Sequence, residues 1–156
     1  MYLSCCIWAL SDENPLRVKN LSDIGFRHID IRATDFQDQT GTPELPVSCV
    51  GLSFGIPDGY RLEDLDSERS MESGAYLLKA LEHAVWADAG YAYVVPEIDS
   101  DPGALSRFAG HLVHLADRAS EYDIKVCIEH FPGRSLPTVL DTLSFIQEVS
   151  HPNLYL

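Results

Sequence analysis

Short apolar runs alternate with amphipathic segments along the whole chain, and this alternation limits the fold more than any other feature. Residues that suit buried strands occupy six runs, at 2–8, 28–32, 47–53, 91–96, 124–129 and 153–156. Apolar residues at helical spacing predict helices over 14–24, 67–89 and 137–150, and another that opens at Asp101-Pro102. Strands and helices that alternate in this way form a parallel α/β sheet. A chain of 156 residues normally makes one unit, so we expect a single domain over residues 1–156.

Three of the expected helices carry an apolar stripe, which predicts the side that faces the sheet. In the helix over 67–89 the stripe consists of Met71, Ala75, Leu78, Leu81 and Val85. In the helix that opens at Asp101 it consists of Leu105, Phe108, Leu112, Leu115 and Ala119. In the helix over 137–150 it consists of Val139, Leu140, Leu143, Ile146 and Val149.

Two parallel α/β architectures fit this order of elements. A doubly wound open sheet usually carries a glycine-rich phosphate loop after its first strand. The first apolar run here leads into residues 9–15, Ala-Leu-Ser-Asp-Glu-Asn-Pro, which contain no glycine. This favours the second architecture, a partial (β/α)₈ TIM barrel with about five strands and the start of a sixth.

The net charge limits the classes of partner that the chain can bind, and the cysteine usage indicates its cellular compartment. The net charge of −13 repels nucleic acid and anionic membranes, so we expect neither as a partner. None of the four cysteines forms a Cys-x-x-Cys pair, which predicts reduced thiols rather than a zinc site. The N-terminus lacks the basic and apolar regions of a signal peptide, and residues 3–10 are too short to cross a bilayer. These features predict a soluble cytoplasmic protein.

The run Ile124 to His130 is the best candidate for carrying chemistry. It reads Ile-Lys-Val-Cys-Ile-Glu-His, a buried strand that ends on a carboxylate and an imidazole. Parallel α/β proteins place their chemistry at the C-terminal ends of strands. Glu129 is therefore positioned to take part in chemistry rather than only to keep the protein soluble.

Several stretches, taken in order, are similar to one known family. They are LSCCIWAL (3–10), LSDIGFRHIDI (21–31), LPVSCVGLS (45–53), ALEHAVWADAGYAYVVP (80–96), YDIKVCIEH (122–130) and DTLSFIQEVSHPNLYL (141–156). The chain resembles the xylose isomerase-like TIM barrels, which include sugar-phosphate isomerases and epimerases and the endonuclease IV group. The order and spacing of the stretches, over nearly all 156 residues, carry the resemblance.

The resemblance implies a divalent metal, Mg, Mn, Co or Zn, held by Glu, Asp, His and Glu from successive strands. Glu129 matches the first of these ligands, and in isomerase-like members such a Glu also moves a proton. The matching Asp is expected just beyond Leu156. A full barrel takes about 250 residues. The chain is therefore expected to be the N-terminal five-eighths of a barrel, truncated at its C-terminus.

Four further residues are candidates for substrate binding, and three of them have a plainer alternative. Trp8 is expected to form an apolar wall against a sugar, or else to pack in the core. Asp30 is expected near the substrate, or else in a salt bridge with its strand neighbours. Arg134 would meet a phosphate or carboxylate, or else lie solvated on its loop. Glu97 stands where many relatives carry a histidine, which argues against a second metal and against endonuclease chemistry.

We expect a metal-dependent sugar or sugar-phosphate isomerase or epimerase that is inactive as this chain alone. The first alternative is a non-catalytic fragment or assembly module that forms a homo-oligomer or pairs with a complementing C-terminal portion. An endonuclease IV-like nuclease is the second alternative, and the acidic charge disfavours it.

Overall fold

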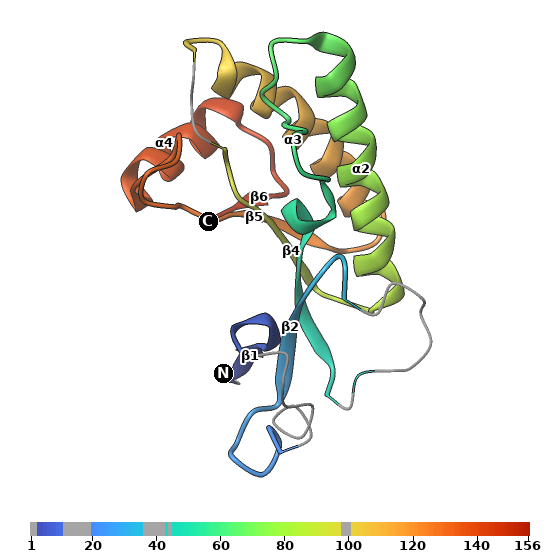
Figure 1. Ribbon diagram of the computed structural model, residues 1–156. Helices are drawn as coiled ribbons and strands as arrows, with labels where there is room; N and C mark the ends of the chain where they lie inside the picture. The colour runs from blue at the N-terminus through green and yellow to red at the C-terminus, as the bar shows by residue number, and fades with distance from the viewer. Residues whose placement is uncertain (1–2, 11–19, 36–42, 44, 98–100) are drawn as a thin grey trace.

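The computed structural model describes residues 3–10, 20–35, 43, 45–97 and 101–156. Within them, six strands form one sheet in the order β1-β2-β3-β4-β5-β6, and every neighbouring pair is parallel (Figure 1). The strands are β1 Ser4–Cys6, β2 His28–Arg32, β3 Val47–Gly51, β4 Tyr91–Val94, β5 Lys125–Ile128 and β6 Leu154–Tyr155. A doubly wound sheet reverses its strand order at a switch point, whereas this sheet runs in sequence order throughout. The expected partial (β/α)₈ barrel is therefore confirmed.

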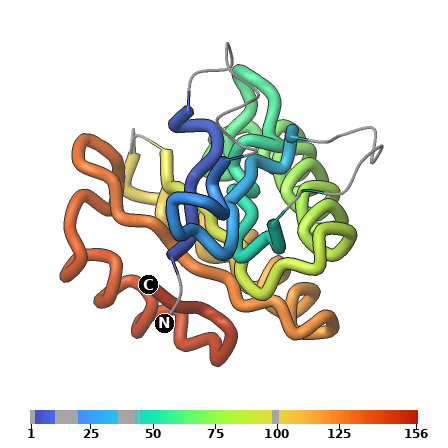
Figure 2. Tube along the Cα trace, turned by 90° about the horizontal axis from the view of Figure 1, so that it is seen from below, coloured from blue at the N-terminus to red at the C-terminus, as the bar shows by residue number. Residues whose placement is uncertain are grey.

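Among the described residues, three α-helices follow the curve of the sheet on its outer side (Figure 1). They are α2 Ser67–Trp86, α3 Ala104–Ser120 and α4 Val139–Val149, and short 3₁₀ helices, η1 Ile7–Ala9 and η2 Leu52–Gly55, follow β1 and β3. Both views place α2 and α4 on opposite sides of the molecule with α3 between them (Figures 1 and 2). The helix expected over 14–24 lies mostly outside the described residues. Gly25, where it was expected to end, has φ +104°, a conformation that suits glycine.

The hydrophobic core lies between the sheet and these helices. Alternate strand residues such as Ile29, Ile31 and Val126 point outward and are almost fully buried. The residues between them, for example His28, Asp30 and Arg32, are only half-buried. The face of the sheet that corresponds to a barrel interior is therefore more polar and more open than the helix-covered face.

The stripe predicted for α3 is correct, because Phe108, Leu112, Leu115 and Ala119 are all buried. The stripe predicted for α2 is wrong at Met71, Ala75 and Leu78, which are exposed. The face of α2 that packs inward consists mostly of small or polar residues: Ser70, Ser73, Leu77, Ala80, Leu81, His83 and Ala84. These small residues let the helix lie close to η2: a Cβ added at Gly55 would be 2.7 Å from the Cβ of Ala80.

The stripe predicted for α4 is wrong in its first three residues and correct at Ile146 and Val149, which pack partly buried against the core. Leu140 is 74% exposed, and Val139 and Leu143 are also exposed. Thr142 and Phe145 are the buried residues of this helix, and the Phe145 ring stacks on Phe108 of α3 at 5.8 Å. The inward face of α4 therefore combines the Phe145 contact with Ile146 and Val149, which pack partly buried against the core, while the aliphatic residues of its first turns face outward.

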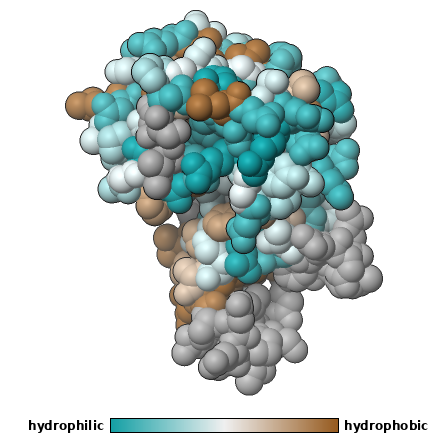
Figure 3. Space-filling model, turned by 45° about the horizontal axis from the view of Figure 1, so that its top comes forward, coloured by the Kyte–Doolittle hydropathy of each residue, from teal (hydrophilic) through white to brown (hydrophobic). Residues whose placement is uncertain are grey.

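The outer surface agrees with the acidic composition. In Figure 3 hydrophilic side chains cover most of the visible face and apolar residues form separate patches. None of the described helices is both long enough and apolar enough to cross a bilayer.

We predict that Phe108→Ala lowers the free energy of unfolding by about 3–5 kcal/mol, because a fully buried ring that contacts Phe145 is lost. Urea denaturation followed by circular dichroism measures the change. Leu140→Ala is the control and should change stability by less than about 0.5 kcal/mol, since this side chain is exposed. An equally large loss for Leu140→Ala would contradict the orientation of α4.

Candidate functional site

A hollow of about 310 Å³ lies at the C-terminal end of the sheet and contains Glu129. Its lining consists of Cys6, Trp8, Tyr93, Cys127, Ile128, Glu129, His130 and Leu156. Glu129 directly follows β5, and Trp8 lies in η1 directly after β1. The parallel sheet therefore brings two of the sequence-predicted site residues, more than 120 positions apart, into one hollow.

Aromatic rings form one wall of this hollow. The Trp8 ring packs against Tyr93 at 6.3 Å and against Phe54 of η2 at 5.7 Å between ring centroids. Trp8 is half-buried, so one part of its ring packs while another part stays accessible. Such a surface suits the apolar face of a sugar ring, and it also satisfies the packing alternative for Trp8.

Asp30 lies deeper in the sheet and is not among the residues that line the hollow. Its carboxylate accepts hydrogen bonds from the hydroxyls of Ser4, at 2.7 Å, and of Ser48. The Cys6 thiol also donates to it at 3.6 Å. The expected salt bridge with Arg32 is not formed, because Arg32 pairs with Asp35 at 3.0 Å. Asp30 is held as a hydrogen-bond acceptor among hydroxyl and thiol groups.

The thiols near the hollow stay protonated at neutral pH. Burial, followed by the charge of Asp30, raises the pKa of Cys6 to about 11. Burial also raises the pKa values of Cys49 and Cys127. Because the thiolate is the nucleophile and the metal ligand, these side chains act as small apolar groups.

Burial, followed by the charge of Glu129, likewise raises the pKa of Tyr93. The phenol therefore keeps its proton. It can donate a hydrogen bond into the hollow beside Glu129.

Glu97 and Arg134 bind each other across the ends of β4 and β5. The Arg134 guanidinium donates to the Glu97 carboxylate. The backbone N–H and the hydroxyl of Ser135 donate to the Glu97 carbonyl, at 3.0 and 2.7 Å. This connection fastens the loop after Glu129 to the neighbouring strand, and it already uses Arg134, which was expected to meet a substrate anion.

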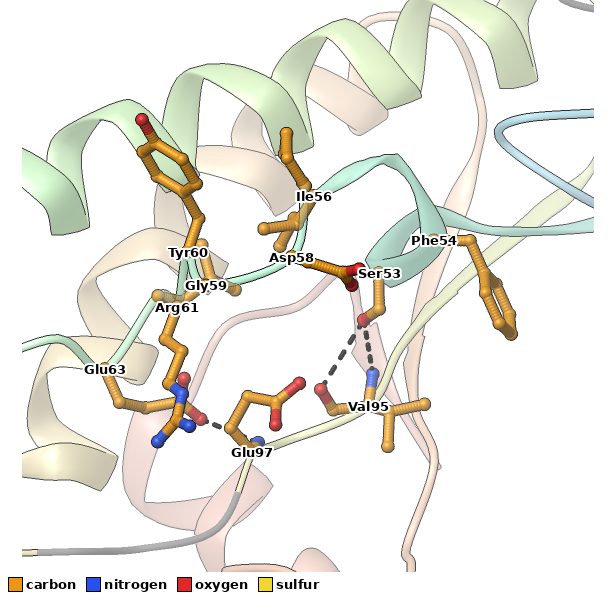
Figure 4. Close-up of a pocket in the computed structure, with 12 residues that line it drawn as sticks. Ser53, Phe54, Ile56, Asp58, Gly59, Tyr60, Arg61, Glu63, Val95 and Glu97 are labelled. Atoms are coloured by element: carbon orange, nitrogen blue, oxygen red, sulfur yellow. Dashed lines mark hydrogen bonds between the residues drawn. The ribbon is translucent and has the colours of Figure 1, made fainter.

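A second hollow, of about 340 Å³, lies beside the first and was not predicted from the sequence (Figure 4). It contains Glu63, which lies in the segment between η2 and α2. Glu63 is 6% exposed, and burial raises the pKa of its carboxyl. No spacing pattern marks this residue in the sequence, where Asp64 and Asp66 follow it closely before α2 begins.

The described residues do not provide a complete metal site. Glu129 is the carboxylate of the first hollow, and His130 lies beside it. In the described part of the chain, no three His, Cys, Asp or Glu side chains gather closely enough to hold a metal ion. One carboxylate next to protonated thiols does not match the ligand sets of divalent metals.

Neither a family model nor a curated protein matches this sequence. Solved structures do match it. D-psicose 3-epimerase, crystallised in the presence of D-fructose, has a TM-score of 0.77 and 19% identity, over 99% of this chain and 62% of its own. The IolI protein with a bound zinc has a TM-score of 0.73 and 17% identity, over 99% of this chain and 61% of its own. A xylose isomerase-like TIM-barrel protein from Mycobacterium smegmatis in complex with magnesium has a TM-score of 0.65 and 16% identity, over 89% of this chain and 53% of its own.

The chain has the xylose isomerase-like TIM-barrel fold. The resemblance expected from the sequence is confirmed for the fold. The chain spans about 60% of the length of the first two solved structures. Within the described residues, the part of this fold that is seen is a sheet of six parallel strands in sequence order.

We predict that Asp30→Asn increases the rate at which iodoacetamide alkylates Cys6 at about pH 8. Removal of the Asp30 charge lowers the pKa of Cys6 and so raises its reactive thiolate fraction; each unit of pKa is worth about tenfold. Peptide mass spectrometry measures the rate. Cys127 is an internal control, because Asp30 is not among the causes of its pKa shift. An unchanged Cys6 rate, or an equal change at Cys127, would contradict this account.

Proposed function

We propose that the chain forms part of the active site of a sugar or sugar-phosphate isomerase or epimerase. The observation that supports this most directly is the hollow shared by Glu129 and the Trp8 ring at the C-terminal end of the sheet. In (β/α)₈ enzymes this end of the barrel carries the active site. A carboxylate beside an aromatic wall suits a ligand that has both an apolar ring face and an exchangeable proton.

In this proposal each side chain has a separate task. The rings of Trp8, Tyr93 and Phe54 bind and orient the sugar. The carboxylate of Glu129 takes a proton from the sugar carbon that it faces, or returns one. The Tyr93 hydroxyl, protonated because burial raises its pKa, donates to a sugar oxygen.

The divalent metal of the proposal would involve Glu129. Its other ligands would have to come from outside the described residues, since these provide no group of three. We therefore propose that the chain alone neither holds a metal stably nor turns over substrate. Its length, about 60% of that of the D-psicose 3-epimerase, agrees with this proposal.

We predict that D-fructose changes the fluorescence of Trp8, because the sugar would stack on this exposed part of the hollow. Trp8→Phe should abolish the change, whereas the matched Trp86→Phe, in α2, should keep it. The same samples should neither epimerise D-fructose nor retain equimolar Mn²⁺ after dialysis. Turnover with bound metal would contradict the proposed inactivity, and a response that survives in Trp8→Phe would contradict the proposed site.

The assembly-module alternative has its own supporting observation. Apolar side chains of α4 and β6 are exposed next to the sheet edge formed by β6, including Leu140, Leu143, Tyr155 and Leu156. Such a surface at an edge strand favours association, with a second copy or with a complementing C-terminal portion.

This alternative predicts an oligomer at micromolar concentration that Leu140→Asp dissociates, because the substitution places a charge in the apolar interface. Light scattering during size-exclusion chromatography measures the mass. Lys79→Asp on α2 serves as a control for the added charge. A wild-type chain that runs as a monomer contradicts the alternative.

A further inference from the structure

The second hollow lies between the segment that follows β3 and the end of β4. Its lining consists of Ser53, Phe54, Ile56, Pro57, Asp58, Gly59, Tyr60, Arg61, Leu62, Glu63, Val95 and Glu97. In Figure 4 the side chains of Glu63, Arg61 and Glu97 converge on one side of the hollow, while the Phe54 ring points away from them. We propose that this hollow is a separate binding site for a neutral polyhydroxylated ligand, with Glu63 as the residue that contacts a ligand hydroxyl.

Glu63 has one satisfied oxygen and one unsatisfied oxygen. Oε1 accepts a hydrogen bond from the Glu97 N–H at 2.9 Å. Oε2 is buried and has no hydrogen-bond partner among the described residues. A buried polar atom without a partner destabilises a fold, so a ligand that supplies the partner recovers that free energy on binding. The unsatisfied oxygen is therefore the feature that points to a ligand.

The surroundings hold Glu63 in place before any ligand arrives. The Arg107 side chain, from α3, donates to the Glu63 carbonyl at 2.8 Å. Glu97, which donates to the Glu63 carboxylate, is itself fixed by Arg134 and Ser135. A site held by three separate elements loses little conformational freedom when it binds.

Charge selects the class of ligand. Asp58, Glu63 and Glu97 contribute carboxyl groups to the lining and Arg61 a guanidinium, Arg134 pairs with Glu97, and the whole chain has a net charge of −13. This field disfavours phosphate and other anions. A metal ion is disfavoured because the described residues contain no group of three suitable ligands. A hydroxyl group can donate to Glu63 Oε2 while a neighbouring one accepts from Arg61, so a polyol matches both.

The ligand should bind more tightly as pH rises. Burial raises the pKa of Glu63, so its carboxyl takes up a proton more readily than an exposed one. A ligand hydroxyl that donates to Oε2 stabilises the ionised carboxylate. By linkage, ligand binding lowers this pKa, and ionisation of Glu63 strengthens binding. This inference is independent of Glu129 and of the proposed isomerase chemistry.

NMR of the full chain with ¹³C-labelled glutamate carboxyls tests the proposal, with D-fructose as the probe. D-fructose should shift the Glu63 carboxyl and the Gly59 and Glu97 amides, and its dissociation constant from these signals should fall several-fold between about pH 5 and pH 8. In Glu63→Gln the dissociation constant should not change with pH, because the amide does not ionise. Glu148→Gln, an exposed acid of α4, is the matched control and should behave as the wild type.

A wild-type pH dependence that survives in Glu63→Gln would overturn the proposal. So would a response of these signals to inorganic phosphate or methylammonium but not to D-fructose. If Glu63→Gln does not fold, the Glu63 carboxyl is titrated in the wild type instead: its pKa must be lower with D-fructose than without it. Shifts confined to Trp8 and Glu129 would refute this second site and would not contradict the proposed function. Shifts confined to Glu63 would support this second site and contradict sugar binding in the Glu129 hollow.

Discussion

Burial of the outward face of the parallel sheet against α2 and α3 is the interaction on which the rest of the structure depends. Outward residues such as Ile31 and Val126 are completely covered, and this fixes which residues of each strand point the other way. A shift of one residue in a strand would move Asp30 or Cys127 into the helix-covered core. The same parallel order brings every strand to an end at one side of the sheet, which is why both hollows lie there.

The sequence was sufficient for the strands and for the inward face of α3, and insufficient for the inward faces of α2 and α4. The bounds of β2 agree with prediction, because the alternation of a half-covered strand is visible in His-Ile-Asp-Ile-Arg. Large aliphatic residues were a poor guide to α2, whose inward face includes Ser73 and Ala80 and lies close to Gly55 of η2 at Ala80. In α4 the inward face includes Phe145, which stacks on Phe108, and a partner on a distant helix cannot be deduced from local spacing.

The candidate site was predictable only where a strand end marked it. Glu129 was found because it directly follows a buried strand, and Trp8 because it follows the first one. Glu63 belongs to an irregular segment, and its importance comes from burial and from an oxygen left without a described partner. The engagement of Arg134 by Glu97 was likewise invisible, since 37 residues separate the two. Properties that arise from contacts between loops cannot be deduced from local sequence patterns and become visible only in the folded structure.

The Glu97–Arg134 connection has a consequence for how a ligand could enter. Together with the two hydrogen bonds from Ser135, it makes the rim between β4 and β5 one continuous wall. Loop closure needs a segment that can move, and this part of the rim is held by bonds from both its backbone and its side chains. A ligand that reached the Glu129 hollow would therefore find its β4–β5 side already in place, and binding on that side would need no loop closure.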